Sequence, residues 1–374
     1  MDTGRAENGG GLDLSQLVAA VRFFTPSRLV LAREIEGLTA KELATRIEAT
    51  PSAISQFENG AARPKAETIL RLSLALGVTP EFFSGDPIHP ITEYRCHFRG
   101  SRSATAKERR HVLARGTAIK RVVDHVRELV NFPVEKLTPL HAVWEAAHDP
   151  EVLADAARDF WNLGYGPIAN CIGLVESIGV IPLEVPGHTQ KLDAFSTWVD
   201  ELPMMFLSTD KGSSSRRRFD VAHELGHLLM HWNCEPGTRE AEEQANAFAS
   251  AFLLPRKPFL AECPRSVDWS RMRELKRRWG VSLAAIVRRA RDLGVLSEAT
   301  YRRAFTYLNQ MGWRTSEPDE PVMERPALVS RALGLLNEAG IGLQQIAKTL
   351  SFSEGLIDRL LGTQPSEQFS LGFR

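Results

Sequence analysis

The stretch Arg218 to His231 reads RFDVAHELGHLLMH, and its pattern decides the architecture of the central part of the chain. Apolar residues recur through it at helical spacing, so we expect a helix. His223 and His227 lie four residues apart and share one face of that helix, where both imidazoles can bind a single zinc ion. Glu224 is rotated by about 100° from His223, and this position suits a carboxylate that takes a proton from a metal-bound water.

The following segment supplies candidates for a third metal ligand. Arg239 to Pro255 reads REAEEQANAFASAFLLP, which predicts a second helix. Glu242 lies on the apolar stripe of this helix with Ala245 and Ala249. We prefer Glu242 as the ligand because a buried carboxylate needs a partner, and a metal ion provides one. Glu243 lies one step off the stripe and stays open as the alternative.

Two more side chains near the motif are weaker candidates. His231 continues the four-residue spacing, but helix geometry places it about 12 Å from His223. That separation is too large for one ion whose bonds are roughly 2 Å long. We therefore expect a structural or supporting role for His231, and we keep Cys234 as an alternative ligand.

The segment Leu38 to Gly60, LTAKELATRIEATPSAISQFENG, has the pattern of two short helices joined by a tight turn. Thr39 with Glu42 three residues later forms a capping box that starts the first helix. Thr50 is the expected N-cap of the second helix, with Pro51 at its first position. Small polar residues stay exposed at the start of the second helix, which is the geometry of a helix-turn-helix DNA reader.

Residues Arg28 to Phe83 resemble the phage-repressor (XRE, Cro/C1-like) family in the motif ISQFENG, in Arg63-Pro64 and in the ending LALGVTPEFF. The resemblance implies a double-stranded DNA operator as the partner. It also implies four DNA-facing residues: Thr50, Ser52, Gln56 and Asn59. The first and last of these would hold phosphates, and the middle two would read base edges in the major groove.

The module departs from that family at two positions and carries no excess charge. Ala40 stands where the family often has glutamine, and Glu48 stands where its turn often has glycine. Seven basic residues balance seven acidic ones between Arg28 and Glu81. DNA affinity would then depend on dimerisation or on the next stretch, Arg95 to Arg127, with ten basic residues against two acidic ones. A solvated helix face or linker is the alternative reading of that stretch.

A second resemblance covers roughly Ile168 to Pro255. Asp193 to Ser196, Arg216 to Phe219, the motif AHELGHLLMH and the pattern E-x-x-A-N-x-F-A before LLP are similar to the ImmA/IrrE family of metallopeptidases. The resemblance implies a zinc site with a general base, with His223, His227 and Glu242 as ligands and Glu224 as the base. It also implies endopeptidase cleavage of a helix-turn-helix repressor, which switches on stress or mobile-element genes.

The composition is that of an ordinary globular chain, with 43% hydrophobic and 25% charged residues in 374. The overall charge indicates no polyanionic partner, because 46 basic residues balance 46 acidic ones. No apolar run approaches the roughly 20 residues of a membrane-spanning helix, and the Gly-rich start does not have the pattern of a secretory signal. Four widely spaced cysteines form no C-x-x-C pair, so we expect a cytoplasmic protein without membrane contact.

We expect an α+β fold that is mostly α, with an N-terminal helix-turn-helix bundle, a zincin-like peptidase domain with a small β-sheet, and a helical C-terminal region. Strand signals at Val180–Val185, Ala194–Val199 and Met204–Ser208 supply the sheet. The expected divisions are a flexible lead at 1–24, the XRE-type domain at 25–85, a basic helical linker at 86–165, the metallopeptidase domain at 166–258 and C-terminal helices at 259–374.

The C-terminal region contains two helix pairs with helix-turn-helix-like spacing, Leu275–Arg289 and Gly342–Gly362. Packing is the default role for both, and a second DNA contact or a docking surface is the alternative. Together the motifs predict a transcriptional regulator with a zinc-dependent endopeptidase domain, acting as a homodimer on DNA. The alternative is a non-catalytic, zinc-containing regulator or an antitoxin-like module that binds a partner.

Overall fold

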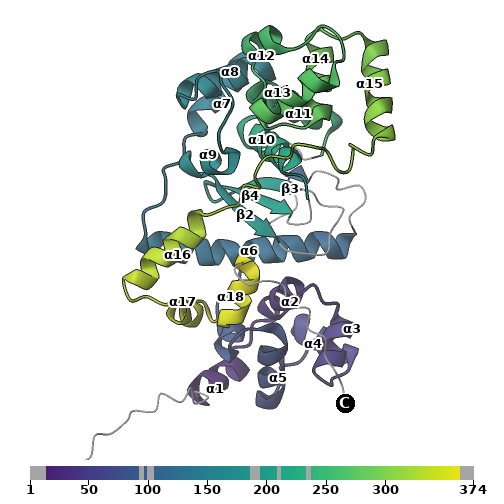
Figure 1. Ribbon diagram of the computed structural model, residues 1–374. Coiled ribbons are helices and arrows are strands. Elements are labelled where there is room, and N and C mark those ends of the chain that lie inside the picture. Colours follow the sequence, from purple (N-terminus) through teal and green to yellow (C-terminus); the bar gives the residue numbers. More distant parts are fainter. Residues whose placement is uncertain are drawn as a thin grey trace, which may run out of the picture. The chain divides into compact units, whose positions relative to one another are not determined.

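The computed structural model describes residues 14–91, 97–98, 105–185, 194–208, 212–232 and 237–362, with only the backbone described at 97–98 and at 185. Within these ranges the chain is mostly helical and has one small sheet (Figure 1), so the expected fold class is confirmed. None of the described helices has the length and apolar character needed to span a membrane. The chain forms two compact units, and the first combines the part up to Pro90 with Arg110–Val122 and Ile341–Leu360.

The N-terminal part of the first unit is a bundle of short helices. Its elements are α1 (Leu14–Arg22), α2 (Pro26–Ile35), α3 (Ala40–Arg46), α4 (Pro51–Glu58), α5 (Ala66–Leu76) and the 3₁₀ helix η1 (Pro80–Ser84). Residues 1–13 lie outside the described residues, but helix α1 corrects the expectation of a flexible lead at 1–24 for Leu14–Arg22, since it packs against α5 and η1. It does so by burying Leu17 and Ala20, whose spacing of three residues is helical.

Helices α3 and α4 form the helix-turn-helix that the sequence predicts. In the capping box, Glu42 N donates to Thr39 Oγ1 at 3.2 Å and Thr39 N donates to Glu42 Oε2 at 2.6 Å. Thr50 Oγ1 accepts a hydrogen bond from Ala53 N at 3.1 Å and starts α4. In the turn, Glu48 has a φ of 55°, the left-handed conformation that glycine adopts at little steric cost. This conformation explains why a glycine would also suit this position.

The C-terminal helices α17 (Leu343–Leu350) and α18 (Glu354–Leu361) also contribute to the first unit. They repeat the α3–α4 turn: Ser351 has a φ of 59°, and Ser353 Oγ accepts from Leu356 N at 3.1 Å. The position on α18 equivalent to Gln56 is Arg359, and its Nη2 lies 2.9 Å from Glu36 Oε1. This side chain therefore contacts protein, which agrees with packing as the role of this helix pair.

The turn between α17 and α18 docks on the turn between α5 and η1. Thr79 N donates to Ser351 O at 3.0 Å, and Ser353 N donates to Gly77 O at 2.9 Å. These reciprocal bonds flank the pairing of Val78 with Phe352. The helix-turn-helix unit is thus completed by residues from the far end of the sequence.

Helix α6 (Ala106–Leu129) carries much of the basic stretch between Arg95 and Arg127. Arg110 Nε lies 3.3 Å from Glu34 Oε1. Arg115 is 8% exposed and donates from Nη2 to the carbonyl oxygen of Arg359 at 2.6 Å. These two arginines therefore serve packing and ion pairing inside the first unit. Arg95, Arg99 and Arg102 lie outside the described residues.

The second unit contains a four-stranded sheet in the order β1-β3-β4-β2. Its strands are β1 (His97–Phe98), β2 (Ile181–Val185), β3 (Ala194–Val199) and β4 (Leu202–Ser208). Strand β3 is antiparallel to β1 and β4, and β2 is parallel to β4. The three predicted strands are present, with ends that differ by at most two residues, while β1 was not expected.

Ten of the described helices lie wholly in the second unit: α7 (Thr138–Ala147), α8 (Pro150–Phe160), α9 (Cys171–Ser177), α10 (Ser214–Met230), α11 (Arg239–Leu253), α12 (Arg256–Glu262), α13 (Trp269–Trp279), α14 (Leu283–Asp292), α15 (Glu298–Gln310) and α16 (Leu328–Glu338). Helix α10 packs between strands β3 and β4 and helix α11 (Figure 1). Helix α9 begins after Asn170, whose Oδ1 caps it by accepting a hydrogen bond from Gly173 N at 2.7 Å.

The acidic, Pro-rich segment at residues 317–326 forms a strap over the second unit. Glu317, Glu320 and Glu324 accept hydrogen bonds from first-turn backbone N–H groups of α14, α10 and α9, each at 2.8 Å. Such N–H groups have no hydrogen-bond partner within their own helix, and a negative charge near them interacts favourably with the positive end of the helix dipole. The strap therefore ties three helix N-termini together, including that of α10.

A buried lysine anchors the strap. Lys276 is 0% exposed, and its Nζ lies 2.7 Å from Glu317 Oε2 and 2.6 Å from Glu320 Oε1. Burial alone would raise the pKa of Glu320, but hydrogen bonds from Lys276 and Ser215 outweigh burial and hold that pKa below its ordinary value. The network keeps its charges paired away from water.

Replacing Lys276 with methionine should lower the free energy of unfolding by about 3–5 kcal/mol, because it leaves buried carboxylates without their cation. Arg277→Met is the matched control, since Arg277 is 52% exposed and pairs with Asp319 at 3.3 Å. We expect that control to cost less than about 1 kcal/mol. Urea denaturation followed by circular dichroism measures both, and equal losses would contradict the role given to Lys276.

Candidate metal centre

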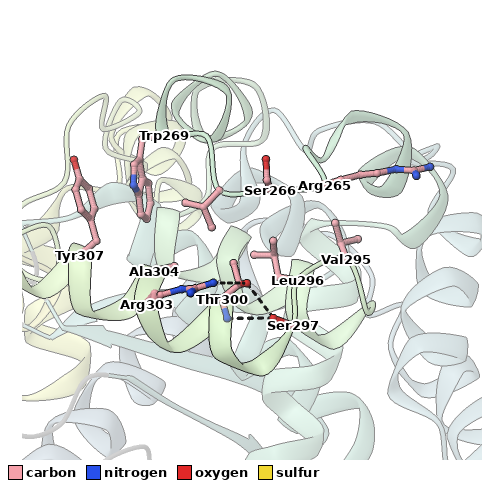
Figure 2. Close-up of a pocket in the computed structure, with 11 residues that line it drawn as sticks. Arg265, Ser266, Trp269, Val295, Leu296, Ser297, Thr300, Arg303, Ala304 and Tyr307 are labelled. Atoms are coloured by element: carbon pink, nitrogen blue, oxygen red, sulfur yellow. Dashed lines mark hydrogen bonds between the residues drawn. The ribbon is translucent and has the colours of Figure 1, made fainter.

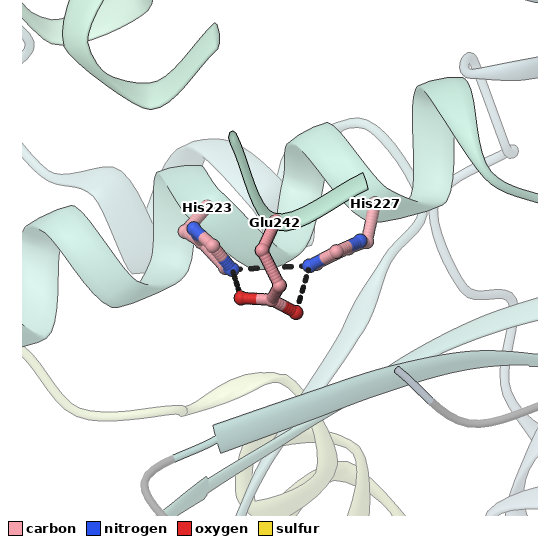
Figure 3. A group of neighbouring side chains, drawn as sticks. All are labelled: His223, His227 and Glu242. Carbon is pink, nitrogen blue, oxygen red and sulfur yellow. Dashed lines mark hydrogen bonds and ion pairs between the residues drawn. The ribbon is translucent and has the colours of Figure 1, made fainter. Parts of the chain in front are cut away.

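Helices α10 and α11 bring His223, His227 and Glu242 together in the second unit (Figure 3). The two Nε2 atoms of the histidines are 3.0 Å apart. The Glu242 carboxylate lies against both rings, with Oε2 3.4 Å from His223 Nε2 and Oε1 3.4 Å from His227 Nε2. Each side chain can offer one ligand atom, and these atoms lie within 4.8 Å of one another.

These separations suit a four-coordinate metal ion. A tetrahedral ion with bonds of about 2.0–2.2 Å holds its ligand atoms about 3.3–3.6 Å apart. The observed separations of 3.0 and 3.4 Å are close to that range. Two imidazoles and one carboxylate are also the donor set of catalytic zinc sites that keep a fourth position open. The residues present therefore fit zinc.

The close approach of α11 to α10 depends on Gly226. A Cβ at this position would lie 3.0 Å from Phe248 Cδ1 and 3.4 Å from Ala245 Cα, both on α11. An alanine here would require Phe248 to shift by a few tenths of an ångström, and a longer side chain would meet the backbone of α11, which carries the ligand Glu242. The glycine inside the histidine motif thus sets the spacing between the two helices that supply the ligands.

Burial sets the charge state of this group. Burial, together with the neighbouring His223 and His231, lowers the pKa of His227 to about 3. A neutral imidazole is the form that binds a metal ion. For Glu242, burial would raise the pKa, but hydrogen bonds from His223 and His227 outweigh burial and hold it below its usual range. The group therefore combines neutral imidazole with an ionised carboxylate.

The structure separates the two glutamates that the sequence left as alternatives. Glu242 faces the histidines, as described above. Glu243 points to solvent, with a 63% exposed side chain whose Oε1 lies 2.7 Å from Arg239 Nε. Cys234, the other alternative ligand, lies outside the described residues.

His231 lies behind His227 and not in the ligand group. Its Nδ1 is 3.0 Å from His227 Nδ1, and its Nε2 is 2.8 Å from Gln244 Oε1. A partner on the second ring nitrogen orients a metal-binding imidazole, so this contact agrees with the expected supporting role of His231. Gln244 was not predicted, because nothing in the spacing along α11 shows that it meets a residue of α10.

Glu224, which follows His223 on α10, is fully buried. Its Oε2 accepts a hydrogen bond from Ser196 Oγ at 2.7 Å. Ser196 lies on β3, and the sequence marked it only as part of a family resemblance. Ser196 and Glu224 are 28 residues apart in the sequence, one on a strand and one on a helix, and the spacing of residues along the chain gives no sign of such a contact.

The four residues expected to face DNA are exposed in the first unit: Thr50, Ser52, Gln56 and Asn59. The two at the ends of α4 also fix its boundaries. Thr50 is its N-cap, and Asn59 follows its last turn, where Oδ1 accepts from Ala61 N at 3.0 Å. The outer face of α4 therefore leaves Ser52 and Gln56 open to solvent between two anchored ends.

A separate cavity of about 640 Å³ lies between α15 and the start of α13 (Figure 2). Trp269 and Tyr307 stack at 4.6 Å along one side, Thr300 and Arg303 line it from α15, and Ser297 lines it from the N-cap of that helix. Its lining includes no histidine and no carboxylate. The cavity thus offers no catalytic base and is not part of the metal centre.

Comparison with known families assigns both parts of the chain. Residues 30–83 match a family described as helix-turn-helix, and residues 176–291 match a peptidase family described as the IrrE N-terminal-like domain. A search of curated proteins found no matching protein. The chain therefore joins an XRE-like, DNA-binding helix-turn-helix domain to an IrrE N-terminal-like domain of the metallopeptidase type, the fusion that its motifs predict.

Proposed function

We propose that this protein is a DNA-binding transcriptional regulator whose second unit is a zinc-dependent endopeptidase. The observation that carries the proposal is the grouping of His223, His227 and Glu242 next to Glu224, within a domain that matches a peptidase family. A structural zinc site would use four protein ligands. Three ligands with a neighbouring buried carboxylate are the arrangement of a hydrolytic site.

Zinc held by these side chains would activate water and polarise a peptide carbonyl as a Lewis acid. The chain's own residues supply the remaining steps. Glu224 takes the proton from the attacking water and delivers it to the leaving amine, a role worth roughly 10²- to 10⁴-fold in rate. The neutral imidazole of His227 and the ionised carboxylate of Glu242 are already in their binding forms.

The proposed substrate is a helix-turn-helix repressor protein, cleaved in the cytoplasm to switch on stress or mobile-element genes. Support comes from the resemblance of the complete motif set to ImmA/IrrE peptidases and from the fusion to a DNA-binding domain. The DNA-binding domain would bring the peptidase to an operator where the substrate repressor is also bound.

On DNA, Ser52 and Gln56 would read base edges while Thr50 and Asn59 contact phosphates. The helix-turn-helix module is electrically neutral, and Arg110 and Arg115 are engaged inside the protein. A single module would therefore gain little from phosphate attraction. We propose a homodimer on two half-sites, because a second copy doubles the number of contacts.

Glu242→Gln should weaken zinc binding by more than the roughly 10- to 100-fold that loss of an outer-shell partner costs. The reason is that it removes the charged oxygen beside His223 and His227. Glu243→Gln is the matched control and should leave the affinity unchanged, because Glu243 is exposed. Competition with a chromogenic chelator measures both affinities, and a weaker Glu243 variant with a normal Glu242 variant would reverse the assignment.

Gln56→Ala should remove about 1–3 kcal/mol of discrimination at one base pair, if Gln56 makes a bidentate base contact. Operators can be selected from random double-stranded DNA with the unaltered protein and then compared by fluorescence anisotropy at fixed salt. Gln344→Ala, an exposed glutamine on α17, is the control and should bind as the parent does. An unchanged sequence preference in the Gln56 variant would place base reading elsewhere.

Glu224→Gln should keep zinc and DNA binding and abolish cleavage, because the amide cannot accept the proton. Cells producing either form can be compared by mass spectrometry of labelled protein N-termini. New termini within a helix-turn-helix protein should arise only with the parent form. Unchanged regulation by the variant would favour a regulator with a non-catalytic zinc site, and well under one zinc per chain would count against the site itself.

A further inference from the structure

We propose that Ser196 is a positioning residue for Glu224: its hydroxyl holds one carboxylate oxygen of the proposed general base in place. The inference rests on the proposed peptidase function. It adds a residue from the sheet to a site otherwise built from two helices.

The side chain of Ser196 faces α10 because of its place on β3. Side chains alternate between the two faces of a strand, and Phe195 on the opposite face stacks on Phe206 at 4.5 Å. Ser196 and Trp198 share the face that meets the helix, where they reach Glu224 and the carbonyl oxygen of Leu228. A step of two residues along the strand, from Ser196 to Trp198, thus corresponds to a step of four residues along the helix, from Glu224 to Leu228, which is about one helical turn.

The hydroxyl has one hydrogen and two acceptors on the same residue. Ser196 Oγ lies 2.7 Å from Glu224 Oε2 and 3.1 Å from the carbonyl oxygen of Glu224. The contact with the carboxylate oxygen is the shorter one and has the usual length of an O–H···O hydrogen bond, while the contact with the carbonyl oxygen is longer than usual. The hydrogen therefore goes to the carboxylate, and the side chains of Ser196 and Glu224 are both 0% exposed.

The alternative, that Ser196 only ties β3 to α10, is weakened by a second bond. Trp198 Nε1 donates to Leu228 O at 3.1 Å and already fixes the strand to the helix one turn further on. That bond ends on the backbone, while the Ser196 bond ends on the side chain of the proposed base. The Trp198 bond therefore joins the strand to the helix backbone, and the Ser196 bond fixes the carboxylate of Glu224.

A glutamate needs such a constraint because its last side-chain torsion is broad. With Oε2 held by Ser196, rotation of the carboxylate is restricted, and Oε1 is presented in a single direction. A base that is already oriented loses less entropy on reaching the reactive geometry. Ser196 therefore affects how Glu224 works and not whether the metal ligands assemble.

The first test needs no substrate. Crystal structures of the metal-free full chain should show Glu224 in one orientation in the parent, in Ser196→Thr and in Trp198→Phe. They should show a rotated or multiply placed carboxylate in Ser196→Ala, with His223, His227 and Glu242 unmoved. An unchanged, single orientation of Glu224 in Ser196→Ala would overturn the proposal.

The second test uses the substrate identified by the N-terminal comparison. Ser196→Ala should lower kcat by about 10- to 100-fold with KM and zinc content unchanged, and Ser196→Thr should restore most of the rate. Trp198→Phe is the matched control and should keep kcat while losing some thermal stability. A Ser196→Ala protein that loses stability but keeps kcat would show a structural tie only, as would an equal loss of kcat in Trp198→Phe.

The two proposals fail in different ways. If the parent protein cleaves nothing, the peptidase function is wrong, and the structural test still decides whether Ser196 orients Glu224. If the parent cleaves and Ser196→Ala is fully active, the peptidase function stands and the role of Ser196 is wrong. Should Ser196→Thr be too unstable to purify, the comparison of Ser196→Ala with Trp198→Phe decides.

Discussion

The close contact between α10 and α11 is the constraint on which the rest of the second unit depends. Gly226 leaves room for Ala245 and Phe248, and this spacing lets Glu242 reach the two histidines of α10. The sheet then covers another side of α10 and supplies the hydroxyl of Ser196. A ligand group drawn from two helices is only as well placed as the packing between them. Small residues at the crossing are therefore as important to the centre as the residues that could bind a metal.

Local patterns in the sequence were enough to predict the parts of both domains that depend on neighbouring residues. The capping box at Thr39, the N-cap at Thr50 and the helix with His223 and His227 all follow from spacings of three or four residues. Partners from distant segments left no such trace. Ser196 meets Glu224 only because a strand crosses a helix 28 residues later in the chain. The expectation of a flexible lead was wrong at Leu14–Arg22 for a related reason, since a nine-residue helix gains its stability mainly from tertiary packing.

The first unit shows how far such distant pairing extends. Its helix-turn-helix core occupies the N-terminal part, yet α17 and α18 come from the end of the described chain and pair with the turn at Gly77–Thr79. The turn that joins α17 to α18 copies the α3–α4 turn in its left-handed residue and in its hydroxyl cap, which is Ser353 in the first turn and Thr50 in the second. Similar spacing in the sequence therefore marks a common way of joining helices, and it does not by itself mark a DNA-reading surface. On α18, Arg359 occupies the position equivalent to Gln56, and its ion pair with Glu36 shows that this position serves packing within the protein.

The acidic strap has a consequence for where this peptidase domain ends as a folding unit. The family match stops at residue 291, whereas Glu317, Glu320 and Glu324 lie beyond it. A fragment trimmed to the matched region, residues 176–291, would keep the histidine motif and lose the acceptors for the amino ends of α10 and α14. It would also lack the first turn of α9, which the strap holds through Glu324. It would also carry Lys276 as a solitary charge in its interior. Homology outlines the chemistry of this domain, but an autonomous version of it has to extend through the strap, or receive that segment as an added peptide.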